Sequence, residues 1–335
     1  MGRILRFGQS MASIGKDNPL VSVIVPLRNR FNLVDEAVDA VYKQNYRPIE
    51  LILVDDCSSQ AYRPKIQAHA GFTVAVIRHQ ENQGPGASRE TGRQRATGAY
   101  LAYLDSDDLW HPAFLEKMVL QLKEKPENGM CYCKTRQFSG EYLNSGSLRP
   151  RNEQAFDAIL PTLLFGRPWS TGACLWTRRA ADQIGPWSEG WTNEDIEYEI
   201  RAGIFGIQIS HLPEVLCYER ETDDPQQLSQ ATHKKALLQK FSSIKAMAIT
   251  VLENKHALEE STRVLFVKKK MRPMVTDLFQ AEEYEKVIEL CKLMNKIVKP
   301  LSKAWLLTAL LLASVRYRKF PGAAKIFQLG CHFLT

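Results

Sequence analysis

Short apolar runs alternate with helical patterns over the first 110 residues. Runs rich in β-branched and other apolar residues occupy 21–25, 49–54, 72–77 and 100–104. Such near-continuous apolar runs predict strands that are buried on both faces of a sheet. Between them, apolar residues recur at helical spacing over 33–41, and a second helical pattern covers 86–96. This alternation predicts βαβ units and a mainly parallel, Rossmann-like α/β sheet with flanking helices.

The pattern changes in the second half of the chain. A Gly-, Ser- and Asn-rich stretch at 140–152 predicts a loop, 172–177 and 207–212 predict strands, and 194–205 predicts a helix. The polar segment 221–230 then breaks the pattern, and everything after 232 is helical in periodicity. We therefore expect an N-terminal extension over 1–18, an α/β domain over 19–230 and an all-helical region over 231–335.

Composition indicates a globular protein. The chain has 335 residues, of which 44% are hydrophobic and 24% charged, and this excludes a disordered chain. The seven cysteines are odd in number and form no CxxC pair, so we expect buried core thiols and a cytoplasmic location. The longest apolar stretch, 304–315, has 12 residues, whereas a membrane-spanning helix needs about 20, so we expect no transmembrane segment.

Charge is distributed unevenly along the chain. Residues 234–335 contain 19 Lys and Arg against 8 Asp and Glu, a net charge of +11, while residues 1–233 carry −4. A tail this basic is either a solvated helical face, a protein-docking element or a surface that binds anionic membrane at the inner face of the bilayer. The apolar stretch 304–315, bracketed by Lys303 and Arg316, favours peripheral membrane binding. No nucleic-acid module is present, so we expect no nucleic-acid partner.

Three acidic clusters carry the candidate chemistry. Asp55-Asp56 and Asp105-Ser106-Asp107-Asp108 each follow a predicted strand, and Glu194-Asp195 opens a predicted helix. Ligands of open α/β sheets bind at the carboxyl ends of the strands. Carboxylates gathered there repel one another, and a divalent cation with a preference for oxygen ligands, Mg²⁺ or Mn²⁺, would offset that repulsion.

Each cluster also has a purely structural interpretation. Asp after a strand is an ordinary turn or N-cap residue, and Asp108 could cap a helix that begins near Pro112. Glu194 could complement a helix dipole. Motifs for other chemistries are absent from the sequence: there is no P-loop, no GxGxxG, no HExxH and no GxSxG.

Five sequence blocks, taken together, resemble the family 2 glycosyltransferases with the GT-A fold. The blocks stand in family order over about residues 19–220, and they read VSVIVPLRN (21–29), LVDDCSS (53–59), NQGPGASR (82–89), LAYLDSDD (101–108) and NED (193–195). The resemblance implies a GT-A domain that binds a nucleotide-diphosphate sugar and a divalent metal, Mn²⁺ or Mg²⁺. It also implies an inverting, metal-dependent transferase of the hexosyltransferase type.

The resemblance assigns the nucleotide-binding residues. By its pattern, Pro26, Arg28 and Asn29 line the nucleotide pocket, and Asp56 hydrogen-bonds the base with Arg89 beside it. Arg28 departs from the family, which usually has an aromatic residue at that position. Stacking on the base is therefore not expected from this residue.

The catalytic assignments follow from the same resemblance. Asp105, Ser106 and Asp107 form the DxD motif, with Asp107 on the metal and Asp105 nearer the ribose and the hydrated ion. Asp195 is the general base that deprotonates the acceptor hydroxyl. The chemistry agrees, because a metal neutralises the leaving diphosphate and one carboxylate base suits direct displacement with inversion.

Three further residues are candidates for acceptor or sugar contacts. Glu194 is assigned to acceptor contact or helix-end electrostatics. The segment 217–220 lacks the His that is common there in the family, and Arg220 is the best substitute for it. Among the tryptophans near the site, Trp191 is either a sugar contact or a core residue, whereas Trp187 favours core packing.

The sequence thus predicts a transferase that moves a sugar, with a UDP-sugar as the favoured donor, to a hydroxyl of a glycan or lipid-linked acceptor in cell-surface polysaccharide biosynthesis. Two alternatives stay open. One is a non-catalytic nucleotide-sugar-binding protein on a transferase scaffold. The other is a nucleotidyltransferase. Such an enzyme needs a loop rich in Gly and in Lys or Arg after the first strand to hold a triphosphate, and here Arg28 and Arg30 are present but the glycines are not.

Overall fold

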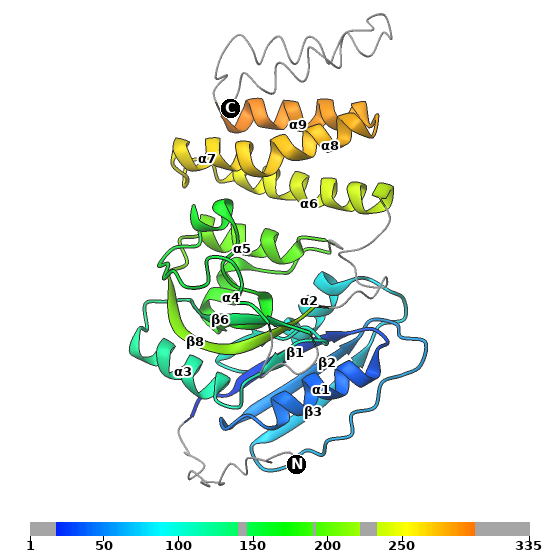
Figure 1. Ribbon diagram of the computed structural model, residues 1–335, viewed down its shortest axis with the longest axis vertical. Helices are drawn as coiled ribbons and strands as arrows, with labels where there is room; N and C mark the ends of the chain where they lie inside the picture. Colours follow the sequence, from blue (N-terminus) through cyan, green and yellow to red (C-terminus); the bar gives the residue numbers. More distant parts are fainter. Residues whose placement is uncertain (1–17, 140–145, 190–191, 222–232, 299–335) are drawn as a thin grey trace, which may run out of the picture.

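The computed structural model describes residues 18–139, 146–189, 192–221 and 233–298, and its centre is one eight-stranded sheet (Figure 1). The strand order is β3-β2-β1-β4-β7-β6-β8-β5. The strands are β1 (Val21–Leu27), β2 (Ile49–Asp55), β3 (Phe72–Arg78), β4 (Tyr100–Tyr103), β5 (Leu109–Trp110), β6 (Met130–Phe138), β7 (Cys174–Thr177) and β8 (Ile209–Arg220).

The first half of the sheet is parallel, as the alternating pattern predicts. Strand β1 pairs in parallel with β2 and β4, and β2 pairs in parallel with β3. All residues of β1 are buried, but β3 lies at the edge, where Phe72 is its only buried residue and the others are half-buried or exposed. The prediction of burial on both faces is therefore wrong for β3, because the faces of this edge strand are only partly covered by the rest of the protein.

The second half of the sheet is mixed. Strand β7 is antiparallel to β4 and β6, whereas β6 and β8 are parallel, with a register shift near Lys134. The strand predicted over 172–177 begins only at Cys174, because a 3₁₀ turn, η2 (Thr171–Ala173), precedes it. Strand β8 extends beyond the predicted 207–212, since it stays paired with β6 and β5 as far as Arg220.

Helices cover the sheet and fix its strand ends. They are α1 (Phe31–Tyr42), α2 (Pro85–Arg95), α3 (Phe114–Glu124), η1 (Thr162–Phe165), α4 (Arg178–Ile184) and α5 (Glu194–Ile204). Helix α2 lies very close to β1 at Gly92, where a Cβ atom would stand 2.3 Å from Cγ2 of Ile24. This close approach requires glycine and lets α2 pack directly on β1.

A stack of helices follows the α/β part (Figure 1). It comprises α6 (His233–Glu253), α7 (Glu260–Phe266), the π-helical segment η4 (Val267–Met271), α8 (Arg272–Gln280) and α9 (Tyr284–Ile297). Buried side chains of these helices, including Met247 and Leu290, belong to the same hydrophobic core as the sheet. None of the helices in the described ranges is long and apolar enough to cross a membrane. The stretch 304–315 lies outside the described residues.

The cysteines confirm the prediction of core thiols within the described part of the chain. Five of them are buried with free thiols, and Cys57 is half-buried. The buried ones are Cys131, Cys133, Cys174, Cys217 and Cys291.

Candidate active site

A cavity of about 710 Å³ opens at the carboxyl ends of β1, β2 and β4. Its size is typical of sites for small molecules. Residues from all three acidic clusters line it, so segments far apart in the sequence meet where the strand order predicts. The lining residues are Pro26, Leu27, Arg28, Asn29, Arg30, Asp56, Asn82, Gly84, Pro85, Ser88, Arg89, Asp105, Ser106, Asp107, Thr192, Asn193, Glu194 and Asp195.

Asp56 follows β2 directly and is buried, and its carboxylate is hydrogen-bonded by groups that precede α2 in the sequence. One carboxylate oxygen accepts from Nδ1 of His79 (2.9 Å) and the backbone N–H of Gln83 (2.8 Å), and the other accepts from the N–H of Gly84 (2.8 Å). With its amide turned to satisfy both neighbours, Asn82 donates to Asp56 (2.7 Å) and accepts from Arg28 (2.8 Å). This end of the cavity is therefore a fixed row of polar groups.

The turn after β1 adds a site residue that the sequence analysis did not assign. Asn29 and Arg30 both adopt left-handed backbone conformations, with φ of 54° and 49°. Asn29 is held there because its N–H donates to Oγ of Ser58 (2.8 Å). The turn directs the Arg30 side chain to Asp107, with 3.1 Å between the guanidinium and the carboxylate. Positive φ at two successive non-glycine residues has no sequence signal, which is why Arg30 was missed.

The loop after β4 presents two carboxylates to the cavity and hides a third. Asp105 and Asp107 line the cavity, while Asp108 is buried and accepts the backbone N–H of Arg220 (3.0 Å). The proposed cap role of Asp108 is wrong, since α3 begins at Phe114 without a side-chain cap. Burial and the neighbouring carboxylates raise the pKa of Asp107 and raise that of Asp108 well above its usual range.

Arg89 joins the two sides of the cavity. This buried residue of α2 donates from one guanidinium nitrogen to Asp105 (2.6 Å) and from another to Glu194 (2.6 Å). Its guanidinium also lies 5.1 Å from the ring centre of Trp187. Arg89 thus bonds Asp105 and Glu194, and it lines the same cavity as Asp56.

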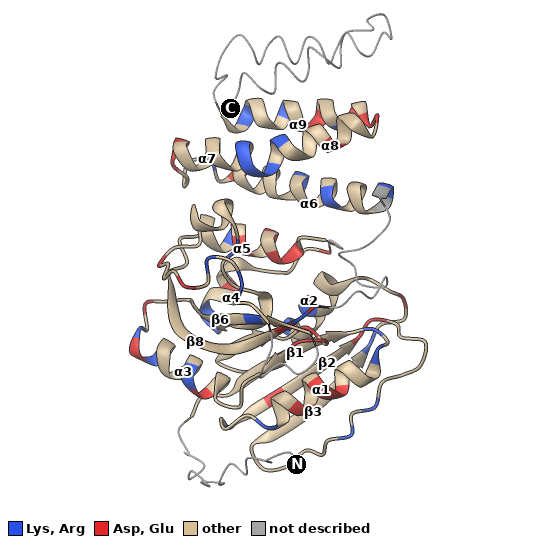
Figure 2. Ribbon diagram, viewed as in Figure 1, with Lys and Arg blue, Asp and Glu red and all other residues tan. Residues whose placement is uncertain are grey.

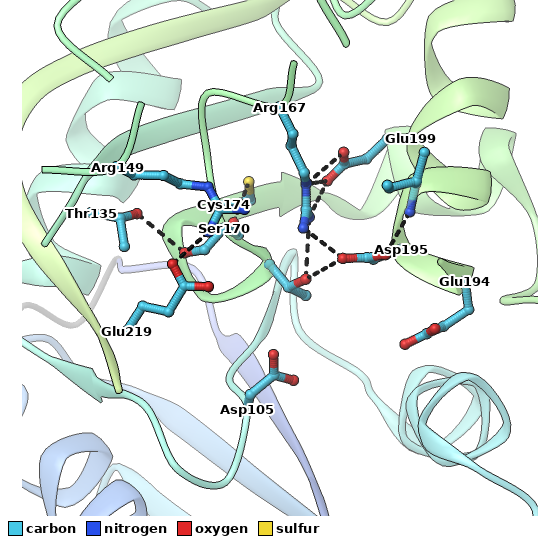
Figure 3. A network of polar contacts seen from close by, with 12 residues as sticks. Asp105, Thr135, Arg149, Arg167, Ser170, Cys174, Glu194, Asp195, Glu199 and Glu219 are labelled. Atoms are coloured by element: carbon cyan, nitrogen blue, oxygen red, sulfur yellow. Dashed lines mark hydrogen bonds and ion pairs between the residues drawn. The ribbon is translucent and has the colours of Figure 1, made fainter. Parts of the chain in front are cut away.

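Asp195 lies across the cavity from Asp105, in a second network of charges (Figure 3). Its carboxylate accepts from Arg167 (2.5 Å) and from the hydroxyl of Thr171 (3.3 Å). Arg167 is held in turn by Glu199, one turn along α5, through Nε (2.9 Å) and a second nitrogen (2.5 Å). Burial acts to raise the pKa of Asp195, but Arg167 and Arg89 outweigh it and lower that pKa.

The remaining predicted contacts are placed as follows. Glu194 lines the cavity and is bonded to Arg89, whereas Arg220 lies behind the Asp107 backbone, where it donates to the Asp107 carbonyl (3.0 Å) and to Glu36 (2.6 Å). Trp187 is buried and stacked on Tyr198, which confirms core packing. Trp191 lies outside the described residues.

The carboxylates on the cavity wall suit a hard divalent cation that takes some of its ligands from the protein and the others from water or a bound diphosphate. Asp105 and Asp107 offer carboxylate oxygens from one loop. Across the described ranges no group of three or more His, Cys, Asp and Glu could hold a metal ion. Mg²⁺ and Mn²⁺ commonly take one or two carboxylates and complete their shell with water and ligand phosphates. The two aspartates therefore fit such an ion in the presence of a diphosphate.

Comparison with known protein families decides the relationship. The family model "Glycosyl transferase family 2" matches residues 22–185, which include β1 through α4 and most of the cavity wall. This chain carries a family 2 glycosyltransferase domain. The predicted family and the GT-A type of α/β fold are thereby confirmed.

Relatives of this glycosyltransferase domain are bacterial. An uncharacterized glycosyltransferase of Rickettsia bellii is 31% identical over 155 residues, covering 43% of this chain and 22% of that protein. The putative teichuronic acid biosynthesis glycosyltransferase TuaG of Bacillus subtilis is 37% identical over 109 residues, which is 32% of this chain and 43% of TuaG. The matched stretch thus spans less than half the length of these curated relatives.

The fold of the glycosyltransferase extends to its helical stack. The crystal structure of S. aureus TarS residues 1–349 in complex with UDP-GlcNAc superposes with a TM-score of 0.67 at 18% identity. The match covers 92% of this chain and 90% of that one. The likeness shows a shared fold.

The Arg89 bridge gives a prediction about stability. Arg89→Met should lower the free energy of unfolding by about 3 kcal/mol, because it leaves the carboxylate of Glu194 buried without its cation. Denaturant unfolding monitored by circular dichroism measures the loss. Arg95→Met, an exposed position on the same helix, removes the same charge and should change stability little. Equal stability of the two variants would show that the bridge contributes nothing.

Proposed function

We propose that this protein transfers a sugar from a UDP-sugar to a hydroxyl of a glycan or lipid-linked acceptor, with inversion at the anomeric carbon, in the synthesis of a cell-surface polysaccharide. The observation that carries the proposal is the joint placement of Asp56, Asp107 and Asp195 on one cavity, most of whose wall lies in the family 2 match. Each has a separate task in such a reaction, and a scaffold that had lost activity would not need all three.

The donor is assigned to the side formed by β1, β2 and α2. Asp56 and the Arg28–Asn82 pair offer hydrogen-bonding groups for a base, and the cationic groups of Arg28 and Arg30 suit a diphosphate. The relative WfgD of Escherichia coli, 29% identical over 116 residues, is named as a UDP-Glc:α-D-GlcNAc-diphosphoundecaprenol β-1,3-glucosyltransferase. That name supports a UDP-sugar donor and a lipid-linked acceptor for this chain.

A divalent metal, Mn²⁺ or Mg²⁺, would be held by Asp107 and, through water, by Asp105. When bound, it would supply positive charge against the leaving diphosphate. Arg30 forms an ion pair with Asp107 at 3.1 Å, so donor and metal binding would move this guanidinium from the carboxylate to the phosphates. In this proposal Arg30 exchanges its ion pair with Asp107 for one with the diphosphate.

Asp195 is the proposed base. Its lowered pKa keeps the carboxylate ionised at neutral pH, and Arg167 and Thr171 fix its orientation. It faces the donor side across the cavity, where an acceptor hydroxyl would attack from the side opposite the leaving diphosphate (Figure 3). The acceptor proton passes to the Asp195 carboxylate as the new glycosidic bond forms.

The direct test is release of UDP from a panel of UDP-sugars in the presence of Mn²⁺, with and without membrane lipid extract as acceptor source. We expect one UDP-sugar to be consumed with acceptor at a rate well above its hydrolysis. A second panel with GDP- and TDP-sugars should give no turnover. If UDP raises the midpoint of thermal unfolding but no UDP-sugar is turned over, the result would favour a non-catalytic binding protein.

The general-base assignment predicts a selective loss of rate. Asp195→Asn should keep UDP affinity within about twofold and lose at least about a hundredfold in kcat, the usual size of a general-base contribution. Steady-state kinetics and calorimetry with UDP measure the two quantities. Asp182→Asn, which alters an exposed carboxylate on α4 outside the cavity, is the matched control. Full transfer by a folded Asp195→Asn variant would remove this residue from the mechanism.

The metal assignment predicts a loss of metal-dependent donor binding. Asp107→Ala should bind UDP equally well in Mn²⁺ and in chelator, whereas the unchanged protein should bind more tightly in Mn²⁺. Calorimetric titration with UDP under both conditions provides the comparison, and Asp39→Ala on the exposed face of α1 is its control. The assignment fails if the Asp107→Ala variant retains the metal-dependent gain in affinity.

Arg167 is proposed as a positioning residue that also sets the charge of the base. Arg167→Gln should raise the pKa of Asp195, because the largest opposing cation is gone, and the acidic limb of the pH–rate profile should move to higher pH. Arg167→Lys keeps the charge and should restore most of the profile. An acidic limb that stays in place in the Gln variant would contradict the role.

A further inference from the structure

The end of β3 brings a histidine to the acidic end of the sheet, where Figure 2 shows acidic residues gathered between β1 and α2. His79 directly follows β3, and its backbone N–H continues the parallel ladder by donating to the carbonyl of Asp55 (2.9 Å). This bond places the His79 side chain beside Asp56, the next residue along the chain. The two side chains are only 8% and 7% exposed, so their contact is shielded from water.

Four donors surround the carboxylate of Asp56. Its Oδ1 accepts from Nδ1 of His79 (2.9 Å) and from the backbone N–H of Gln83 (2.8 Å). Its Oδ2 accepts from the N–H of Gly84 (2.8 Å) and from the side-chain amide of Asn82 (2.7 Å). An ionised carboxylate has about four acceptor positions, so all of them are occupied. A base N–H that binds Asp56 must therefore take the place of one of these donors.

The two oxygens of Asp56 differ in what surrounds them. Asn82 and Gly84, the donors to Oδ2, both line the cavity. Among the described residues, His79 and Gln83, the donors to Oδ1, lie outside the cavity wall. Oδ2 is therefore the oxygen on the cavity side. Its donor from Gly84 is a backbone N–H fixed at the start of α2, whereas the Asn82 amide is a side chain that can rotate away.

The ring of His79 is held at both of its nitrogens. A carboxylate only accepts hydrogen bonds, so Nδ1 carries a proton and donates to Asp56. In the neutral ring Nε2 is then an acceptor, and the hydroxyl of Thr91 on α2 donates to it (2.9 Å). Thr91 thus fixes the tautomer and the orientation of the ring. The chain of bonds from α2 through His79 to Asp56 reaches the carboxylate from the side away from the cavity.

We propose that His79 is a positioning residue for the donor base: it holds Oδ1 of Asp56, so that Oδ2 can exchange the Asn82 amide for an N–H of the base. The proposal rests on the proposed function, which puts the base at Asp56, and adds a residue outside the cavity on which base affinity depends. The base is of the class that has a ring N–H next to a carbonyl, as uracil does. Its N–H replaces the Asn82 N–H at Oδ2, and its carbonyl replaces the Asn82 oxygen that accepts from Arg28.

Two substitutions of His79 separate its bond to Asp56 from its bond to Thr91. In His79→Asn the amide nitrogen can take the place of Nδ1 and donate to Asp56, while the bond to Thr91 is lost. In His79→Gln the longer side chain carries its amide to the place of Nε2, which keeps a partner for Thr91 and removes the donor to Asp56. The control is His256→Gln, the same substitution at an exposed position after α6.

Calorimetric titration of the full chain with UDP in Mn²⁺ measures the effect. We expect His79→Gln to bind UDP about tenfold more weakly, because Asp56 loses a hydrogen bond that holds its charge in place. His79→Asn should stay within about threefold of the unchanged chain, and His256→Gln should bind like the unchanged chain. Equal UDP affinity of His79→Gln and the unchanged chain overturns the proposal. A loss in His79→Asn as large as that in His79→Gln, or larger, also overturns it, since that order follows from a merely structural role of the Thr91 bond.

Steady-state kinetics give a second readout that loosening of the fold would not reproduce. With the UDP-sugar that the unchanged chain consumes, His79→Gln should raise KM about tenfold and keep kcat within about twofold, because the network around Asp195 is unaltered. A fall in kcat as large as the rise in KM would contradict the positioning role. Failure of the unchanged chain to bind UDP would overturn the donor assignment together with this proposal, whereas UDP binding that does not depend on His79 would overturn this proposal alone.

Discussion

The buried guanidinium of Arg89 is the contact on which the geometry of the cavity depends. It bonds the loop after β4 through Asp105 and the start of α5 through Glu194, each at 2.6 Å. The two bonded segments lie about 90 residues apart in the sequence. Because the cation is buried, loss of either carboxylate would destabilise the fold. The position of Asp195 relative to Asp107 is thus fixed by one residue of α2, which the close contact of Gly92 with β1 positions in turn.

A second cation performs the same task for Asp195, the proposed base. Arg167 is held by Glu199, and it lowers the pKa of Asp195 and orients its carboxylate. The helical stack closes the arrangement, since α6 packs on α5 and η4 contacts the segment that contains Arg167. The stack thus supports the helix that carries Asp195 and the segment that contains Arg167.

The sequence predicted the strands and the convergence of the acidic clusters, because apolar runs and strand ends are local patterns. It predicted the edge position of β3 and the length of β8 poorly, since both depend on which strands become neighbours. Arg30 and Arg167 were missed for a related reason. Arg30 reaches Asp107 only through two left-handed residues, and Arg167 reaches Asp195 from a loop with no motif. Arg89 was found, but its partners were not, because the direction of a side chain at a helix start depends on how that helix packs.

A crystal structure of the full chain with UDP and Mn²⁺ tests the central claim most directly. The account predicts the uracil near Asp56 and Arg28, the diphosphate beside Asp105 and Asp107, and Arg30 turned from Asp107 toward the phosphates. Asp195 should stay bonded to Arg167 and face the space where the sugar would project. A nucleotide bound elsewhere on the chain, or one bound in the cavity with its phosphates directed away from Asp105 and Asp107, would contradict the account.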